Sequence, residues 1–230
     1  MINKKVFCIG NVKTGTCSLK QLGISLGYKT VHNYSWCNAD PEKLIKYDFF
    51  TDGGGHIWEP QKTDDINYWG SNMAHSVNKL YKQYPDAKFI LNTRSLEDWL
   101  ISKMYWGGWK KGTSLNSDDS YHKIKYNNIK WRHKSYAAIK DWILYRNNYY
   151  DKVLNFFRKN ENLHNLLLVD YIGDKKSVDK ICNFLGKDII VFDGHFNKNK
   201  KKNLLTTNYF KKILKKVFED LNISDPKSIL

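Results

Sequence analysis

The chain has 230 residues, of which 41% are hydrophobic and 15% aromatic, and we expect one globular domain over residues 1–230 with a single sizeable core. No window approaches the roughly 20 consecutive apolar residues of a membrane-spanning helix, and the first residues contain no long apolar segment of the secretory type. Four scattered cysteines without metal-ligand spacing indicate reduced thiols. These features predict a cytoplasmic protein that does not act on a membrane.

The formal net charge is +15, because 38 lysines and arginines outnumber 23 aspartates and glutamates. A solvated basic surface would explain this excess without any ligand. A surface that attracts a nucleotide, an acidic acceptor or a nucleic acid would explain it equally well. Charge alone therefore does not choose a partner.

The first predicted elements are a buried strand over 6–9 and a helix over 18–26, joined by a turn that contains Gly10 and Gly15. A strand, a loop of small residues and a helix N-terminus together direct backbone N–H groups toward an anion. Gly15 lets the backbone approach closely because it has no Cβ. Hydroxyl donors stand at three positions of this loop: Thr14, Thr16 and Ser18. The stretch predicts a phosphate-binding site.

The two glycines fit the G-x-x-x-x-G-K-[ST] loop that binds nucleoside triphosphates, but the residues after them do not. Thr16 stands where that loop has its lysine, and Cys17 where it has the magnesium-binding hydroxyl. A thiol is a poor ligand for magnesium, which prefers oxygen. The lysine of this loop, Lys13, comes before the second glycine. The pattern therefore indicates an anion site that uses no metal.

Residues 12–19, Val-Lys-Thr-Gly-Thr-Cys-Ser-Leu, resemble the 5′-phosphosulfate loop (Pro-Lys-[Ser/Thr]-Gly-Thr-Thr) of sulfotransferases that use 3′-phosphoadenosine 5′-phosphosulfate, PAPS. Val12 replaces the usual proline and Cys17 the second threonine. The resemblance implies an α/β fold of the P-loop type, with three layers and a mainly parallel central sheet flanked by helices. It also implies transfer of a sulfuryl group from PAPS to an acceptor hydroxyl or amine, with release of 3′,5′-ADP. The implied donor-binding residues are Lys13, Thr14, Gly15, Thr16, Cys17 and Ser18, with Lys13 also catalytic.

Further along the chain, a short strand over 28–32 and a small helix over 41–45 precede a strand over 47–52. That last strand resembles the Y-D-a-f-x-D segment of small single-domain sulfotransferases, whose general base lies near this point. Asp52 ends the strand at the edge where open α/β sheets bind ligands, and it is our first candidate for the base. His56 is the second: its residue type titrates nearest neutrality, but it follows three glycines. An aspartate that only caps a turn is the alternative.

A helix over 72–84 and a buried strand over 87–92 come next. Residues 84–94 resemble the family's Y-P-d-A-K-f-I-L-x-x-R strand. The resemblance implies that Arg94, and Ser102 eight residues later in a helix, bind the donor's 3′-phosphate. The guanidinium fork of arginine matches the oxygens of a phosphate. A helix-capping arginine and a solvent-exposed serine are the alternative.

Residues 105–115 form an aromatic, glycine-containing loop that would act as a lid or as a wall for the acceptor. Residues 121–159 have amphipathic helical periodicity and predict one or two helices. Their apolar stripe predicts packing against the core, with base stacking on nucleic acid as the alternative. The stripe consists of Trp131, Tyr136, Ile139, Ile143, Tyr149, Val153 and Phe157.

A buried strand over 166–171 and a helix ending at Gly186 resemble the segment that closes the sheet in the family. Many relatives carry a tryptophan after the loop's last threonine, where this chain has Ser18, so we assign adenine stacking to Tyr171. A basic loop then precedes a C-terminal helix over 203–221. The resemblance implies that this loop folds over the 3′-phosphate through one of three lysines: Lys198, Lys200 or Lys201.

Three other classes of protein stay open. A P-loop kinase would use ATP and magnesium, and the residues at positions 16 and 17 argue against it. A catalytically inactive sulfotransferase-like binding protein is compatible with Val12 and Cys17. A nucleic-acid-binding module is supported only by charge and aromatic residues, so we do not expect nucleic acid as a partner. The acceptor stays open among small molecules, glycans and protein tyrosines, and an acidic acceptor would suit the net charge.

Overall fold

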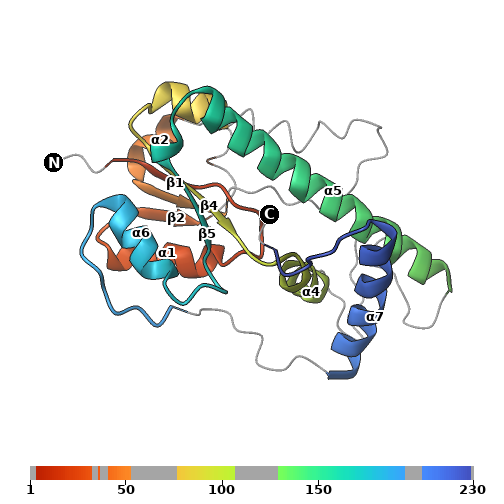
Figure 1. Ribbon diagram of the computed structural model, residues 1–230. Coiled ribbons are helices and arrows are strands. Elements are labelled where there is room, and N and C mark those ends of the chain that lie inside the picture. Colours follow the sequence, from red (N-terminus) through yellow and green to blue (C-terminus); the bar gives the residue numbers. More distant parts are fainter. Residues whose placement is uncertain are drawn as a thin grey trace.

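The computed structural model describes residues 4–32, 36, 41–52, 77–106, 129–194 and 204–228 (Figure 1). Five strands form one parallel sheet in the order β2-β3-β1-β4-β5. The strands are β1 (Val6–Cys8), β2 (Thr30–His32), β3 (Phe49–Thr51), β4 (Lys88–Thr93) and β5 (Leu166–Asp170). Helices cover both faces of this sheet, which confirms the three-layer α/β fold.

The helices of the described residues follow the predicted order. They are α1 (Thr16–Ser25), α2 (Pro41–Lys46), a helix over 77–83, α4 (Leu96–Trp106), α5 (Ile129–Lys159), α6 (Ser177–Leu185) and α7 (Leu204–Asp220), with a 3-10 turn η2 (Leu163–Asn165). α5 is a single helix. The predicted segments 72–76, 107–115 and 121–128 lie outside the described residues. In the part of the chain that the structure describes, no helix is both long and apolar enough to cross a membrane.

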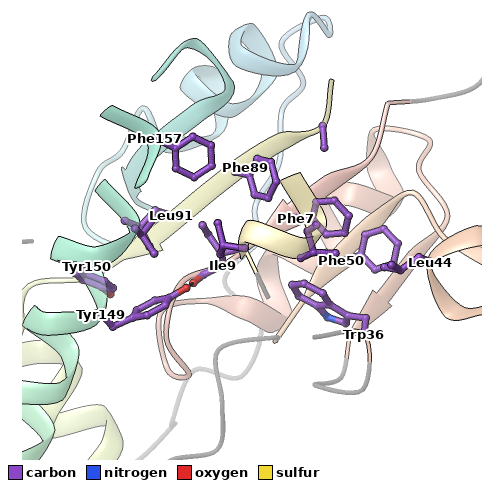
Figure 2. Close-up of a cluster of buried hydrophobic side chains, with 14 residues drawn as sticks. Phe7, Ile9, Trp36, Leu44, Phe50, Phe89, Leu91, Tyr149, Tyr150 and Phe157 are labelled. Carbon is purple, nitrogen blue, oxygen red and sulfur yellow. Dashed lines mark hydrogen bonds between the residues drawn. The ribbon is translucent and has the colours of Figure 1, made fainter. Parts of the chain in front are cut away.

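Alternating strand residues build two separate cores, because successive side chains of a strand point to opposite faces. On β1, Val6 and Cys8 pack with α1 and α6, whereas Phe7 and the following Ile9 pack with α5. Figure 2 shows the α5 side of the sheet, where Phe89 and Phe157 lie with their ring centroids 5.1 Å apart. The apolar runs of the sequence are therefore strands that are buried on both faces.

The strand β5 is less buried than the sequence predicts. Of its residues, Val169 is fully buried, whereas Leu166, Leu167 and Leu168 are only half-buried. The reason is position: β5 pairs with β4 on one side and forms an edge of the sheet on the other. A continuous apolar run indicates a buried strand but does not distinguish a central strand from an edge strand.

A third apolar cluster lies beside the sheet, where α4, α5 and α7 meet (Figure 1). The predicted stripe of α5 is buried at all five positions whose side chains are described, which confirms that it packs against the core. Ile139 and Ile143 contribute to this third cluster. Tyr149, Val153 and Phe157 contribute to the core on the α5 side of the sheet. Trp131 and Tyr136 are outside the described side chains. α5 therefore packs against the sheet with one part of its length and against α4 and α7 with another.

One lysine of the third cluster is buried without a charged partner. Lys103, on α4, is 5% exposed, and its Nζ has no hydrogen-bond partner in the described structure. The Nζ lies 5.0 Å from the ring centroid of Trp99 and 4.4 Å from that of Trp142. Burial lowers the pKa of Lys103 to about 7, because the ammonium form loses its hydration.

Lys103→Met should raise the free energy of unfolding at pH 6 by at least about 1 kcal/mol, because it removes a buried charge that has no hydrogen bond. The pKa of lysine in an unfolded chain is about 10.4. Between that value and the folded pKa of about 7, the unfolded state binds more protons, so the wild type gains stability as pH rises. The advantage of the variant should therefore be largest at pH 6 and smallest near pH 10.

Urea denaturation of both proteins at pH 6, 8 and 10 measures this difference. Lys82→Met is the matched control, because Lys82 is exposed and its substitution should give no pH-dependent difference. An equal effect of Lys103→Met at all three pH values would contradict the assignment of a buried charge.

Candidate active site

The candidate site lies at one edge of the sheet, because the carboxyl ends of parallel strands meet there. The turn at 10–15 follows β1, the central strand. Asp52 follows β3 on one side of β1, and Arg94 follows β4 on the other. His32 ends β2, the next strand beyond β3. Residues that are far apart in the sequence are thus brought to one edge.

A buried amide holds the turn in shape. The backbone N–H of Gly10 donates to Oδ1 of Asn92 at 3.0 Å, and Nδ2 of Asn92 donates to Oγ1 of Thr14 at 2.6 Å. The hydroxyl of Thr14 in turn donates to the carbonyl of Asn11. Gly10 is required here, because a Cβ would lie 1.8 Å from the carbonyl oxygen of Asn92. β4 therefore fixes the turn that follows β1.

Two helices fix the same turn through its carbonyls. The indole N–H of Trp99, on α4, donates to the carbonyl of Val12 at 2.9 Å. The hydroxyl of Tyr149, on α5, donates to the carbonyl of Ile9 at 2.6 Å (Figure 2). From the sequence, Tyr149 is predicted only as part of an apolar stripe, and neither of these two polar contacts with the loop is predicted.

The backbone of the turn is in the left-handed region at two residues. Lys13 has φ +70° and Gly15 has φ +92°. A Cβ on Gly15 would lie 2.7 Å from Cδ1 of Tyr171, so the chain passes closely over that ring. A lysine in this region is strained, and strain of this kind is concentrated at functional sites.

Lys13 lies among the charged groups of the site. Burial lowers its pKa, and electrostatic interaction with Cys17 and Asp52 acts in the opposite direction. Arg94 adds a smaller lowering effect. The ammonium of Lys13 is therefore within electrostatic reach of the groups contributed by α1, β3 and β4.

The threonine hydroxyls of the loop form hydrogen bonds within the protein. Oγ1 of Thr16 donates to Oδ1 of Asp52 at 3.2 Å, and the Thr14 hydroxyl contacts Asn11 and Asn92. Ser18 is buried. The first-turn N–H groups of a helix have no acceptor within the helix itself. In this arrangement an anion would be bound by main-chain N–H groups of α1 and by Lys13.

A thiol and an imidazole adjoin Asp52. Sγ of Cys17 lies 3.2 Å from Nε2 of His32, and Oδ2 of Asp52 lies 3.8 Å from the same nitrogen. Burial lowers the pKa of His32, although the Asp52 charge raises it. Asp52 itself has φ +64°, a second strained residue at this edge. From the sequence, His32 is predicted only as the end of a strand, because its neighbours Cys17 and Asp52 belong to other elements.

Arg94 and Ser102 lie on the other side of the loop. Nε of Arg94 is buried and has no hydrogen-bond partner among the described residues. Its Nη2 is 4.0 Å from Oδ1 of Asp98. Nη2 of Arg146, on α5, donates to the carbonyl of Arg94 at 3.1 Å and so positions it. Ser102 is half-buried on α4. Its role with Arg94 stays a prediction.

Tyr171 is in the core rather than at an open surface. It is 4% exposed and packs with Cys8, Ile181 and Cys182 beneath Gly15. Burial raises the pKa of its hydroxyl well above the usual range. Adenine stacking on this ring stays a prediction, and its burial argues against it. Four further predicted site residues lie outside the described residues: His56, Lys198, Lys200 and Lys201.

A strand, a glycine-containing turn and a helix N-terminus at the edge of a parallel sheet, with an arginine after the neighbouring strand, form a candidate ligand site of an α/β fold. A sulfotransferase domain is matched over residues 5–204, and the chain therefore belongs to the sulfotransferase family. A curated protein, the Ava biosynthesis cluster protein M of Aspergillus versicolor, is 29% identical over 144 residues. This match covers 53% of the chain and 52% of the relative, so the chain spans about half the length of that protein.

Asn92→Leu should lower the free energy of unfolding, because it leaves the Gly10 N–H without its acceptor and removes the hydrogen bond that the Thr14 hydroxyl accepts. The expected loss is roughly 1–3 kcal/mol for each buried polar group left unsatisfied. Urea denaturation measures it. Asn155→Leu is the matched control, because Asn155 is exposed on α5. Equal losses in the two variants would show that the loop does not depend on the buried amide.

Proposed function

We propose that the protein transfers a sulfuryl group from PAPS to an acceptor hydroxyl or amine and releases 3′,5′-ADP. The observation that carries this proposal is the loop at 10–18, with Lys13 and Gly15 in left-handed backbone conformations before the N-terminus of α1. Main-chain N–H groups and one lysine suit the 5′-phosphosulfate, which carries its charge without a metal ion. Membership of the sulfotransferase family supports this choice of donor.

Two buried donors support binding of a phosphorylated ligand. Nδ2 of Asn11, in the loop, and Nε of Arg94, after β4, have no hydrogen-bond partner among the residues described. A buried donor left unpaired costs free energy, so such groups in a native structure call for a missing partner. Arg94 suits the 3′-phosphate, which distinguishes PAPS from ATP. Ser102 and a lysine of the loop 198–201 would complete that part of the site.

The residues around the loop would have different roles in the reaction. Lys13 and the N–H groups at the start of α1 would stabilise the negative charge that develops on the leaving phosphate oxygen. Asp52 would accept the proton of the acceptor, at a carboxylate that the Thr16 hydroxyl already orients. Arg94 would bind and orient the donor.

A small-molecule acceptor is the class we favour. The fungal relative is named as a protein of a biosynthesis cluster, and this name supports a biosynthetic small molecule as the acceptor. The net charge of +15 suits an acidic small molecule, and a glycan is the alternative. We further propose that the protein acts in the cytoplasm.

Isothermal titration calorimetry should show that 3′,5′-ADP binds without a metal ion and more tightly than ATP with magnesium. Arg94→Ala should weaken this binding by roughly 1.5–3 kcal/mol, the value of a charge-assisted hydrogen bond. Arg158→Ala is the matched control, because Arg158 is exposed at the end of α5. Binding of ATP with magnesium, together with no binding of 3′,5′-ADP, would favour a P-loop kinase instead.

Lys13→Ala should lower turnover far more than affinity for 3′,5′-ADP, because the lysine charge is needed most where negative charge develops. Asp52→Asn should lower turnover by about 10²–10⁴ with affinity nearly unchanged, as expected for a general base. Release of 3′,5′-ADP from PAPS in the presence of phenols, alcohols and amines measures turnover. The exposed-site variant Lys82→Met should match the wild type.

Two other outcomes would change these assignments. Near-normal turnover in Asp52→Asn, with a collapse in His56→Ala, would transfer the role of base to His56. Tight binding of 3′,5′-ADP without turnover on any acceptor class would identify a binding protein with an inactive sulfotransferase fold.

A further inference from the structure

Cys17 differs from the other described cysteines in its surroundings. Cys8 and Cys182 are buried in the core, whereas Cys17 is half-exposed in the first turn of α1. Its sulfur lies 3.2 Å from Nε2 of His32. The reaction proposed above gives this thiol and imidazole no task as a pair.

The tautomer of His32 follows from its second contact. Oγ1 of Thr51 donates to the carbonyl of Val31 at 3.3 Å, so it accepts the hydrogen of His32 Nδ1 at 2.8 Å. Nε2 therefore carries the lone pair and faces the thiol of Cys17. Burial lowers the pKa of His32, which keeps the ring uncharged near neutral pH and able to accept a proton.

Charged groups surround the pair. Lys13 lies within electrostatic reach of Cys17, which is in the first turn of α1, at the positive end of the helix dipole. Asp52, 3.8 Å from Nε2, attracts the imidazolium that would form. The positive charge of Lys20 disfavours the imidazolium, but less strongly than Asp52 favours it. The thiolate is the nucleophilic form of cysteine.

We propose that Cys17 is a site of covalent modification by small electrophiles and peroxides, with His32 as the acceptor of the thiol proton. In alkylation by iodoacetamide, the sulfur–carbon bond forms, the carbon–iodine bond breaks, and iodide leaves. With hydrogen peroxide, a sulfur–oxygen bond forms as the oxygen–oxygen bond breaks. The sulfur is then oxidised by two electrons to sulfenic acid, and the peroxide is reduced to water.

Modification of Cys17 and occupation of the anion loop exclude each other. The sulfur belongs to the first turn of α1, whose N–H groups would bind the 5′-phosphosulfate, so an added group takes up the space of the ligand. This second half of the inference rests on the proposed function. Modification would therefore switch donor binding off.

The test is the rate at which iodoacetamide labels each cysteine of the full chain, followed by mass spectrometry of the cysteine peptides. Cys17 should react at least about tenfold faster than Cys8 and Cys182, the buried internal controls. His32→Gln should slow Cys17 about tenfold, because the proton acceptor is lost. His164→Gln, at an exposed histidine, should leave the rate unchanged.

A Cys17 rate equal to that of the buried cysteines overturns the inference, and this comparison needs no variant. Equal slowing by His32→Gln and His164→Gln overturns the role of His32. Hydrogen peroxide followed by dimedone should label the same residue, and labelling elsewhere only would contradict the peroxide reaction.

Protection by 3′,5′-ADP separates this inference from the proposed function. Slower labelling of Cys17 with 3′,5′-ADP present supports both. Fast, His32-dependent labelling that 3′,5′-ADP does not slow supports the modification site and contradicts donor binding at the loop. Calorimetric binding of 3′,5′-ADP by a protein whose Cys17 is unreactive supports the donor site and overturns the modification site.

Discussion

The site depends on one buried side chain, the amide of Asn92. It accepts a hydrogen bond from the Gly10 N–H and donates one to the Thr14 hydroxyl, so β4 shapes the turn that follows β1. Trp99 and Tyr149 add hydrogen bonds to carbonyls of the same turn from α4 and α5. Because these contacts are buried, their loss would leave unpaired polar groups in the core. The strained backbone at Lys13 can persist because its surroundings hold it.

Buried positive charge is the second constraint. Lys103 is buried between two tryptophan rings, and Arg146 is buried against Trp99 and Tyr150. Burial lowers the pKa of both groups, which means that the fold is less stable than it would be with neutral side chains. Arg94, whose carbonyl accepts a hydrogen bond from Arg146, has a buried Nε that finds no hydrogen-bond partner in the described part of the chain. Such an arrangement suits a protein whose ligand brings the negative charge.

The sequence by itself predicted which segments are strands and which are helices, and where the loop lies among them. Hydrophobic periodicity predicted alternating strands and helices, and glycine spacing placed the loop between the first strand and helix, whereas the parallel three-layer sheet was implied by the resemblance to sulfotransferases. Arg94 was placed at the end of a strand by its motif. These predictions succeed because hydrophobic period and glycine position are local properties, which a sequence displays directly.

What only the tertiary structure decided is which distant residues meet. Asn92 and Trp99 read as strand and helix core in the sequence, and their polar contacts with the loop exist because β4 and α4 lie beside β1. His32 joins Cys17 only because β2 pairs with β3 at the same sheet edge, and Tyr171 is covered because β5 packs its end under Gly15. Strand order brings these residues together. Strand order is set by long-range packing between segments, which local sequence patterns do not encode.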